Sequence, residues 1–476
     1  MQHDPVRWFE ALGVSSEDIR ATLAVATAHG CDDADLYFEH TTSTSVGMMD
    51  RKVNRASTSV DLGMGVRVVV QDQVGFAYTE DLSRASLLEA ARTASLIARY
   101  GTRSGRPIAV GTPTPAAYYP VARDWAEVSV LERVPYLRRW EAEAFSRDAR
   151  IAKVQASLSD ADKWVLIARA DGLVVGDYRP MTQAAVSCTA IDGTRRESGG
   201  YNVSARRDLG YYDADRQTRM VREAVARAIG ALSAGDCPAG EMPVVLAAGS
   251  SGILLHEAIG HGMEADFNRK GISIYADKLG KRIAPPGVTV VDDATLAGAR
   301  GSLNVDDEGS PTERTTLVRD GVLTSYLHDR ISARAYGVPS TGSGRRESFR
   351  HPVLPRMRST YLEPGPHSAE EIIGSVRFGL LAETFANGQV QIGAGDFSFY
   401  VRSGWLIEDG RKTRPVKDVN LIGNGPAVLE AIELVGDDLV VDEGGWTCGK
   451  DGQSVPVSQG MPTVRVGRLS VGGGRG

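Results

Sequence analysis

The pattern of hydrophobic and polar positions changes several times along the chain and predicts both helices and antiparallel strands. From Asp35 to about Thr79, apolar and polar residues alternate, and Val, Tyr, Phe and Thr are frequent, which is typical of antiparallel strands. Elsewhere apolar residues recur at the spacing of amphipathic helices. These helical segments are 16–30, 82–100, 130–148 and 213–235.

The remaining pattern divides the chain into two halves. Residues 102–123 are rich in Pro, Gly and Thr and are expected to form an exposed connector. Asp171-Gly172 and Asp192-Gly193 mark hairpin turns between further strands. The stretch 234–243 is a loop of small residues and prolines, and short strands with one short helix follow it. We therefore predict an α+β protein of two domains. Residues 1–238 form an N-terminal domain with a mixed antiparallel sheet and helices, and residues 239–476 form a mostly antiparallel β domain.

Composition narrows the class of protein. A chain of 476 residues is too long for one ordinary hydrophobic core. The net charge of −6 argues against a nucleic-acid partner, which usually needs a basic surface. No run approaches the roughly 18 apolar residues of a membrane span, so no membrane partner is expected. The four cysteines are widely scattered and fit no disulfide framework, which favours a cytoplasmic location.

The segment GILLHEAIGHGMEADFNRKG (252–271) places His256, Glu257 and His261 within six residues. Zinc protease helices usually carry H-E-x-x-H, which directs both rings to one ion. Here the histidines are five residues apart, about 140° around an ideal helix. Either a π-bulge or a helix end at Gly260 would bring the rings back together, and the glycines flanking the second histidine provide backbone freedom. The segment thus predicts a metal site on a distorted helix, the alternative being a helix end with two partly exposed histidines.

The candidate chemistry extends beyond the two histidines. Glu257 is expected on a different side of the helix, and in zinc hydrolases such a glutamate takes a proton from the metal-bound water. A helix-surface glutamate is the alternative. Because zinc takes three or four protein or solvent donors, a third ligand must come from elsewhere. The residues considered are Glu264, Asp266, His328, His351 and Cys448, and composition alone does not choose among them.

Several ordered blocks resemble the TldD/PmbA family, and the resemblance is to its TldD-type subunit. It runs along nearly the whole chain and is densest after residue 240. The early blocks are GMGVRVVV and VGFAYTE. The later ones are LLHEAIGHGMEADFNRKG, TGSGRRESF, PRMRSTYLEPG, NGQVQIGAGDFSF, LIGNGP and CGKDGQSVPV.

This resemblance implies a cytoplasmic zinc metallopeptidase that cleaves short or unfolded peptides and trims the leaders of peptide antibiotics. It implies that Zn²⁺ is held by His256, His261 and Cys448, with Glu257 catalytic. It also implies a partner, either a TldE/PmbA-like homologous subunit that lacks the histidine motif or a second copy of this chain. Because this chain keeps the motif, it resembles the catalytic subunit.

Three other functions fit the sequence less well than a peptidase does. The Gly- and Arg-rich stretch 340–358 suggests phosphate binding but lacks the lysine and following helix of a phosphate loop. A hairpin loop is expected there, and the resemblance suggests that Arg345 or Arg346 holds a substrate carboxylate or carbonyl. A non-enzymatic regulator of the gyrase-modulator type is the main alternative, yet such a regulator has no need of Glu257. A deaminase is disfavoured because its paired-cysteine signature is missing.

Overall fold

The computed structural model describes residues 3–98 and 116–472, so most of the expected connector at 102–123 lies outside the described residues. The predicted α+β class is confirmed. A six-stranded N-terminal sheet, in the order β3-β2-β1-β4-β5-β6, is antiparallel throughout. Its strands are β1 (Asp33–Met49), β2 (Lys52–Val70), β3 (Gln73–Thr79), β4 (Ile151–Arg169), β5 (Val174–Asp192) and β6 (Arg195–Ala205).

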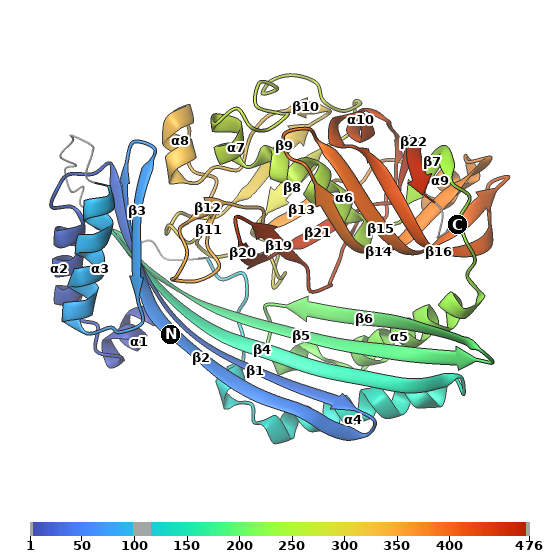
Figure 1. Cartoon of the computed structure of the whole chain (residues 1–476), viewed down its shortest axis with the longest axis horizontal. Helices are drawn as coiled ribbons and strands as arrows, with labels where there is room; N and C mark the ends of the chain where they lie inside the picture. Colours follow the sequence, from blue (N-terminus) through green and yellow to red (C-terminus); the bar gives the residue numbers. More distant parts are fainter. Residues whose placement is uncertain (1–2, 99–115, 473–476) are drawn as a thin grey trace.

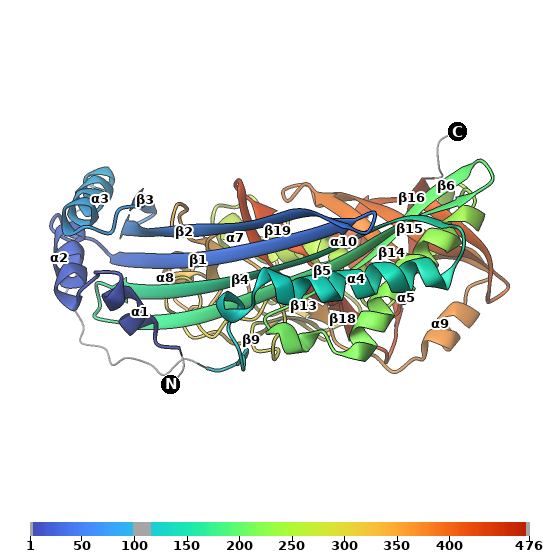
Figure 2. The same ribbon diagram turned by 90° about the horizontal axis from the view of Figure 1, so that it is seen from below.

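Helices cover one face of this long, curved sheet, and the other face is turned toward the C-terminal half (Figures 1 and 2). Two separate apolar cores lie under the helices, one at each end of the sheet. The opposite face contributes Tyr37, Val165 and Ile167 to a small core shared with Val305 and Phe349 of the C-terminal half. The helices are α1 (Pro5–Ala11), α2 (Ser16–Ala26), α3 (Arg84–Ile97), α4 (Val130–Arg147) and α5 (Ala214–Ser233).

The C-terminal half contains two further six-stranded sheets. One has the order β16-β15-β14-β7-β22-β17, and an additional pairing of β16 with β22 closes five of these strands into a ring. Most pairings are antiparallel, but β14 runs parallel to β7. The strands are β7 (Gly240–Leu246), β14 (Phe378–Val390), β15 (Asp396–Glu408), β16 (Arg411–Asn424), β17 (Ile432–Val435) and β22 (Val464–Gly472).

The second C-terminal sheet has the order β10-β9-β8-β13-β21-β18, and two short hairpins, β11-β12 and β19-β20, lie beside it. Its strands are β8 (Val290–Asp293), β9 (Arg314–Arg319), β10 (Val322–Leu323), β13 (Ser359–Leu362), β18 (Val440–Val441) and β21 (Ser458–Met461). The hairpin strands are β11 (Gly344–Arg345), β12 (Leu354–Pro355), β19 (Thr447–Lys450) and β20 (Gln453–Pro456). The helices in this half include α8 (Arg330–Tyr336), α9 (Ala369–Gly374) and α10 (Gly425–Glu430).

The predicted boundary at 234–243 follows the last residue of α5 and includes the start of β7, which belongs to the ring-forming sheet. The division into domains 1–238 and 239–476 stays a prediction. None of the helices in residues 3–98 and 116–472 is long and apolar enough to cross a membrane.

Candidate metal centre

The histidine motif lies on a buried helical segment that follows β7. It starts as a short turn, η3 (Ser250–Gly252), and continues through α6 (Ile253–Leu255). Residues 253–255, Ala258, Ile259 and Met263 belong to the main apolar core of the C-terminal half. Gly252 is needed at the start of the segment because a side chain there would collide with the backbone of Gly460 in β21. The segment is thus packed between elements that fix its position and rotation.

The unusual spacing of the histidines is accommodated by a π-helical turn. This turn, η4, spans His256–Gly260, and a 3₁₀ turn, η5 (His261–Met263), follows without a break. In a π turn the hydrogen bonds run between residues five apart, so residues at that spacing share a face. The first of the two alternatives is therefore the one observed. The helix does not end at Gly260, whose φ of −57° and ψ of −49° are helical.

Gly260 has a different role from the backbone freedom that we expected. A side chain at this position would overlap the sulfur of Met357. Likewise, a side chain at Gly262 would meet the ring of Tyr275. The two glycines therefore allow neighbouring side chains to pack directly on the backbone that carries His261.

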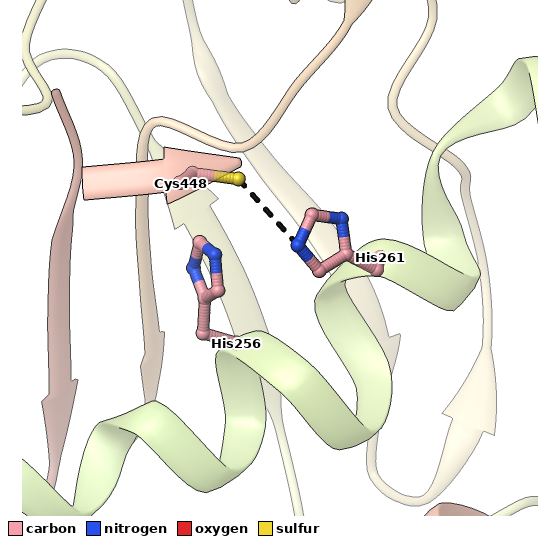
Figure 3. Close-up of side chains that lie close together, drawn as sticks. All are labelled: His256, His261 and Cys448. Atoms are coloured by element: carbon pink, nitrogen blue, oxygen red, sulfur yellow. Dashed lines mark hydrogen bonds between the residues drawn. The ribbon is translucent and has the colours of Figure 1, made fainter. Parts of the chain in front are cut away.

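The hairpin β19-β20 brings Cys448 to the motif helix. Its strands are joined through Asp451 and Gly452, both with positive φ, which is typical of a tight hairpin turn. Cys448 is 187 residues from His261 in the chain, yet its Sγ lies 3.5 Å from His261 Nε2 (Figure 3). The backbone carbonyl of Cys448 accepts a hydrogen bond from Arg356 at 2.6 Å, which fixes the strand on its other side.

Three potential ligand atoms converge at this point. Donor atoms of His256, His261 and Cys448 lie within 4.8 Å of one another, and all three residues are buried. The two rings are nearly perpendicular, with centroids 5.1 Å apart, and both face the sulfur (Figure 3). Nδ1 of His256 is buried and has no hydrogen-bond partner among the described residues.

The electrostatics of the site favour a thiolate. Burial alone raises the pKa of the Cys448 thiol, but the adjacent imidazoles of His256 and His261 outweigh it and hold the pKa well below its usual value. Burial lowers the pKa of His261, but Glu264 and Cys448 reverse this and raise it well above the usual value. Thiolate and imidazole are preferred zinc ligands. The donor set therefore fits a zinc ion.

Glu257 lies beside these donors. Its Oε2 is 3.9 Å from His261 Nε2, and its side chain is 18% exposed. The π turn thus brings the carboxylate closer to the histidines than the expected placement on a different side of the helix. Burial raises the pKa of Glu257, while the neighbouring imidazoles partly oppose the rise. A carboxylate with a raised pKa beside the donors is suited to accept and return a proton.

Arg345 and Arg346 have different hydrogen-bond partners in the structure. Both are buried. Arg345 donates to the carbonyls of Met357 and Pro456 at 2.6 and 2.7 Å. Arg346 donates to the carboxylate of Asp35 at 2.9 Å. Their predicted contact with substrate stays a prediction.

Family models match most of the chain. The PmbA/TldA metallopeptidase domain 1 model matches residues 34–98, the central domain model matches 123–232, and the C-terminal domain model matches 239–473. The chain belongs to the PmbA/TldD family. The C-terminal domain model contains all three converging residues and Glu257.

Relatives of this PmbA/TldD protein are named as metalloproteases. The metalloprotease TldD homolog of Haemophilus influenzae is 38% identical over 468 residues and covers 97% of each chain. The zinc metalloprotease TldD homolog of Saccharolobus solfataricus is 33% identical and covers 56% of this chain and 59% of its own.

Two solved structures share the fold of this PmbA/TldD protein. A Thermotoga maritima protein described as a candidate modulator of a DNA gyrase has a TM-score of 0.78 and 22% identity, covering 96% of this chain and 99% of its own. TldE from Thermococcus kodakarensis has a TM-score of 0.73 and 19% identity, covering 95% and 99%.

A charge network behind His261 was missed by sequence reasoning. Nδ1 of His261 lies 3.0 Å from Glu264, which was considered only as a metal ligand. Lys450 Nζ lies 3.1 Å from the same carboxylate and 2.7 Å from Asp266. Of the other residues considered as third ligands, His328 and His351 lie outside the group of converging donors. The sequence did contain one signal for Lys450. It is two residues from Cys448 on an expected strand, so both side chains lie on the same face of that strand.

Proposed function

We propose that this PmbA/TldD protein is a zinc-dependent metallopeptidase that cleaves short or unfolded peptides. The observation that carries the proposal is the convergence of His256, His261 and Cys448 beside Glu257. The metalloprotease names of its relatives support the same class of reaction. A regulator without enzymatic activity would not need a proton-accepting carboxylate next to a buried donor set.

The residues of the site would have different roles in the proposed reaction. His256, His261 and Cys448 would hold Zn²⁺, and Glu264 would orient His261 through its Nδ1. When bound, zinc acts as a Lewis acid that polarises a carbonyl and makes water more acidic. Glu257 would accept a proton from the attacking water and deliver it to the leaving amine, for which its raised pKa is suited.

The burial of the site supports the proposed class of substrate. His256, His261 and Cys448 are at most 5% exposed, and Glu257 is only partly exposed. A folded protein cannot bring a peptide bond to such a site, whereas an extended chain can enter. We further propose that a TldE-like homologous subunit pairs with this chain, in a cytoplasmic location, because its fold is shared by TldE. A mass measurement of the purified protein alone would show whether a second copy takes that place.

The decisive experiment compares the wild type with Glu257→Gln. Zinc per chain is measured by elemental analysis, and cleavage is followed on an unstructured peptide by mass spectrometry. The variant should retain zinc and lose cleavage by about 10²–10⁴-fold, because only proton transfer is removed. Near-normal cleavage by a zinc-loaded variant would contradict the role of Glu257. A wild type that cleaves nothing when zinc-loaded and supplied with its partner would contradict the proposed function.

A further inference from the structure

A cavity of about 310 Å³ lies between the N-terminal sheet and the hairpin β19-β20, and its lining is strongly cationic. The hairpin contributes Thr447 and residues 454–456, and the sheet contributes Thr41 and Ser43. The charged residues of the lining are Lys163, Arg179, Arg206, Arg300, Arg345, Arg346, Asp307 and Glu347. Six cations thus face two carboxylates in a protein whose overall charge is −6.

Half of these cations are neutralised by carboxylates of the protein. Lys163 lies 2.9 Å from Glu39. Arg179 is paired with both Asp177 and Asp307. Arg346 is paired with Asp35. Two of these ion pairs, Arg179 with Asp307 and Arg346 with Asp35, join the two halves of the chain.

The other three cations have no carboxylate partner among residues 3–98 and 116–472. Arg345 donates only to the two backbone carbonyls already described. Arg300 donates to the carbonyl of Trp446 at 2.9 Å and to the hydroxyls of Ser204 and Thr447. These bonds satisfy N–H groups but leave the positive charges uncompensated.

Arg206 has the fewest polar contacts of these three arginines. It is 4% exposed, and its guanidinium makes no hydrogen bond or ion pair with any described residue. Its guanidinium carbon lies 5.2 Å from the centroid of the Tyr119 ring, a cation–π contact that provides no hydrogen-bond acceptor and no negative charge. A buried guanidinium is normally paired because its desolvation is expensive. Arg206 lines the cavity, so a partner for it would have to occupy that space.

The pKa shifts of Arg206 and Arg300 indicate that these arginines lack enough negative charge around them. Burial lowers the pKa of Arg206 and the charge of Arg179 lowers it further, while Tyr119, Asp177 and Asp307 oppose the fall only in part. Burial and the charge of Arg206 lower the pKa of Arg300 to about 10. Each cation therefore disfavours the charged state of its neighbour, and an anion among them would relieve the repulsion.

We propose that this cavity is a binding site for a small oxyanion, a carboxylate or a phosphate group, held by Arg206, Arg300 and Arg345. The planar fork of a guanidinium matches the oxygens of both groups. The cavity volume is at the lower end of the range for small-molecule sites, roughly 300–1,000 Å³, which suits a phosphate ion or one terminal residue of a peptide. The proposal does not depend on peptidase activity.

The site lies on the opposite face of β19 from the metal centre. Thr447, which lines the cavity, precedes Cys448, and successive side chains of a strand point to opposite faces. Arg300 contacts both the carbonyl of Trp446 and the hydroxyl of Thr447. An anion that orders Arg300 would therefore also order the strand that carries Cys448.

Thermal unfolding of the whole chain tests the proposal without any measurement of catalysis. Wild type, Arg206→Met and Arg206→Gln are compared in phosphate and in chloride at equal ionic strength. Arg138→Met is the matched control, since Arg138 is an exposed residue of α4 and its loss changes the net charge equally. A second arm replaces phosphate with an N-acetylated tripeptide that has a free terminal carboxylate, or with the corresponding amide.

The wild type and Arg138→Met should gain about 2–3 °C in melting temperature at an anion concentration 100 times the dissociation constant. Both Arg206 variants should lose this gain. A gain with phosphate alone would identify a free anion as the ligand, and a gain with the acid but not the amide would identify a peptide carboxylate. Equal responses of the wild type and the Arg206 variants to phosphate and to the peptide acid would overturn the proposal.

Discussion

Replacing Lys450 with methionine tests whether the charge network behind His261 supports the metal centre. The Lys450 side chain is 2% exposed, and its Nζ lies between the carboxylates of Glu264 and Asp266. It also donates to the carbonyl of Pro355 at 3.1 Å. The ammonium is therefore the main positive charge holding two buried carboxylates next to each other.

The expected loss of stability in Lys450→Met depends on the positive charges that remain beside Glu264. Removing one partner of a buried ion pair typically costs about 3–5 kcal/mol, because the other charge is left uncompensated. Arg356 Nε stays 3.8 Å from Glu264, so part of the compensation remains and we expect a loss of about 3 kcal/mol. Lys450, with a larger effect than His261, holds the pKa of Glu264 at about 2 against its burial, so the pKa of Glu264 should rise in the variant. A less strongly charged Glu264 orients His261 less firmly, which should weaken zinc binding by about 10–100-fold.

The assay combines urea unfolding of the metal-free protein with zinc competition against a chelating dye. Lys281→Met is the matched control, because Lys281 pairs with Asp277 at 3.2 Å but is 57% exposed. An exposed pair of this kind contributes at most about 1 kcal/mol. Equal urea midpoints for the two variants, together with unchanged zinc affinity in Lys450→Met, would refute the reasoning.

Three further predictions concern the metal and the buried charges. Cys448→Ser should lose both zinc and peptide cleavage, whereas Cys188→Ser should keep both. Elemental analysis and a peptide assay would measure them, and full zinc in Cys448→Ser would exclude Cys448 as a ligand. Removing zinc with a chelator should abolish cleavage but leave the far-ultraviolet circular dichroism unchanged, and activity that persists at undetectable zinc would contradict a metal-dependent reaction. Burial raises the pKa of Glu308 from its ordinary value to about 8, so the stability contributed by its protonated form falls as pH rises to about 8 and changes no further above it. Between pH 6 and pH 9, the urea midpoint should therefore fall further in the wild type than in Glu308→Gln. Equal falls in the two proteins would count against a raised pKa of Glu308.

Amphipathic segments with good caps were predictable from sequence. The predicted helix at 130–148 is observed as α4, which begins after a capping box of Ser129 and Glu132. The short helices α1, α8 and α10 were missed, since six or seven residues carry too little periodicity to be recognised. Among the short strands expected after residue 243, the segment 321–329 forms only the two residues of β10, and Leu327 beyond it makes an isolated bridge to Glu264.

The candidate site was predictable as a set of residue types and not as a geometry. The histidine spacing indicated a distortion, but two distortions satisfied it equally well. The structure shows a π turn, and it also shows that Met357 packs where a side chain at Gly260 would lie, a contact that the sequence does not reveal. The isolation of Arg206 could not be predicted either, because only the folded structure shows that no carboxylate among residues 3–98 and 116–472 pairs with its buried guanidinium.

The geometry of the metal centre is set by protein contacts that do not involve an ion. On one side, the motif helix is fixed by apolar packing and by the close approach of Gly252 to β21. On the other, Lys450 ties the strand that carries Cys448 to Glu264, which lies just beyond the helix and contacts His261. His261 is thus linked to Cys448 both directly and through Glu264 and Lys450. Small zinc domains fold only when they bind metal, because the ion itself closes their loops. Here buried charges and packing lie along both sides of a loop of 187 residues, so we expect removal of a bound ion to affect the proposed chemistry more than the fold.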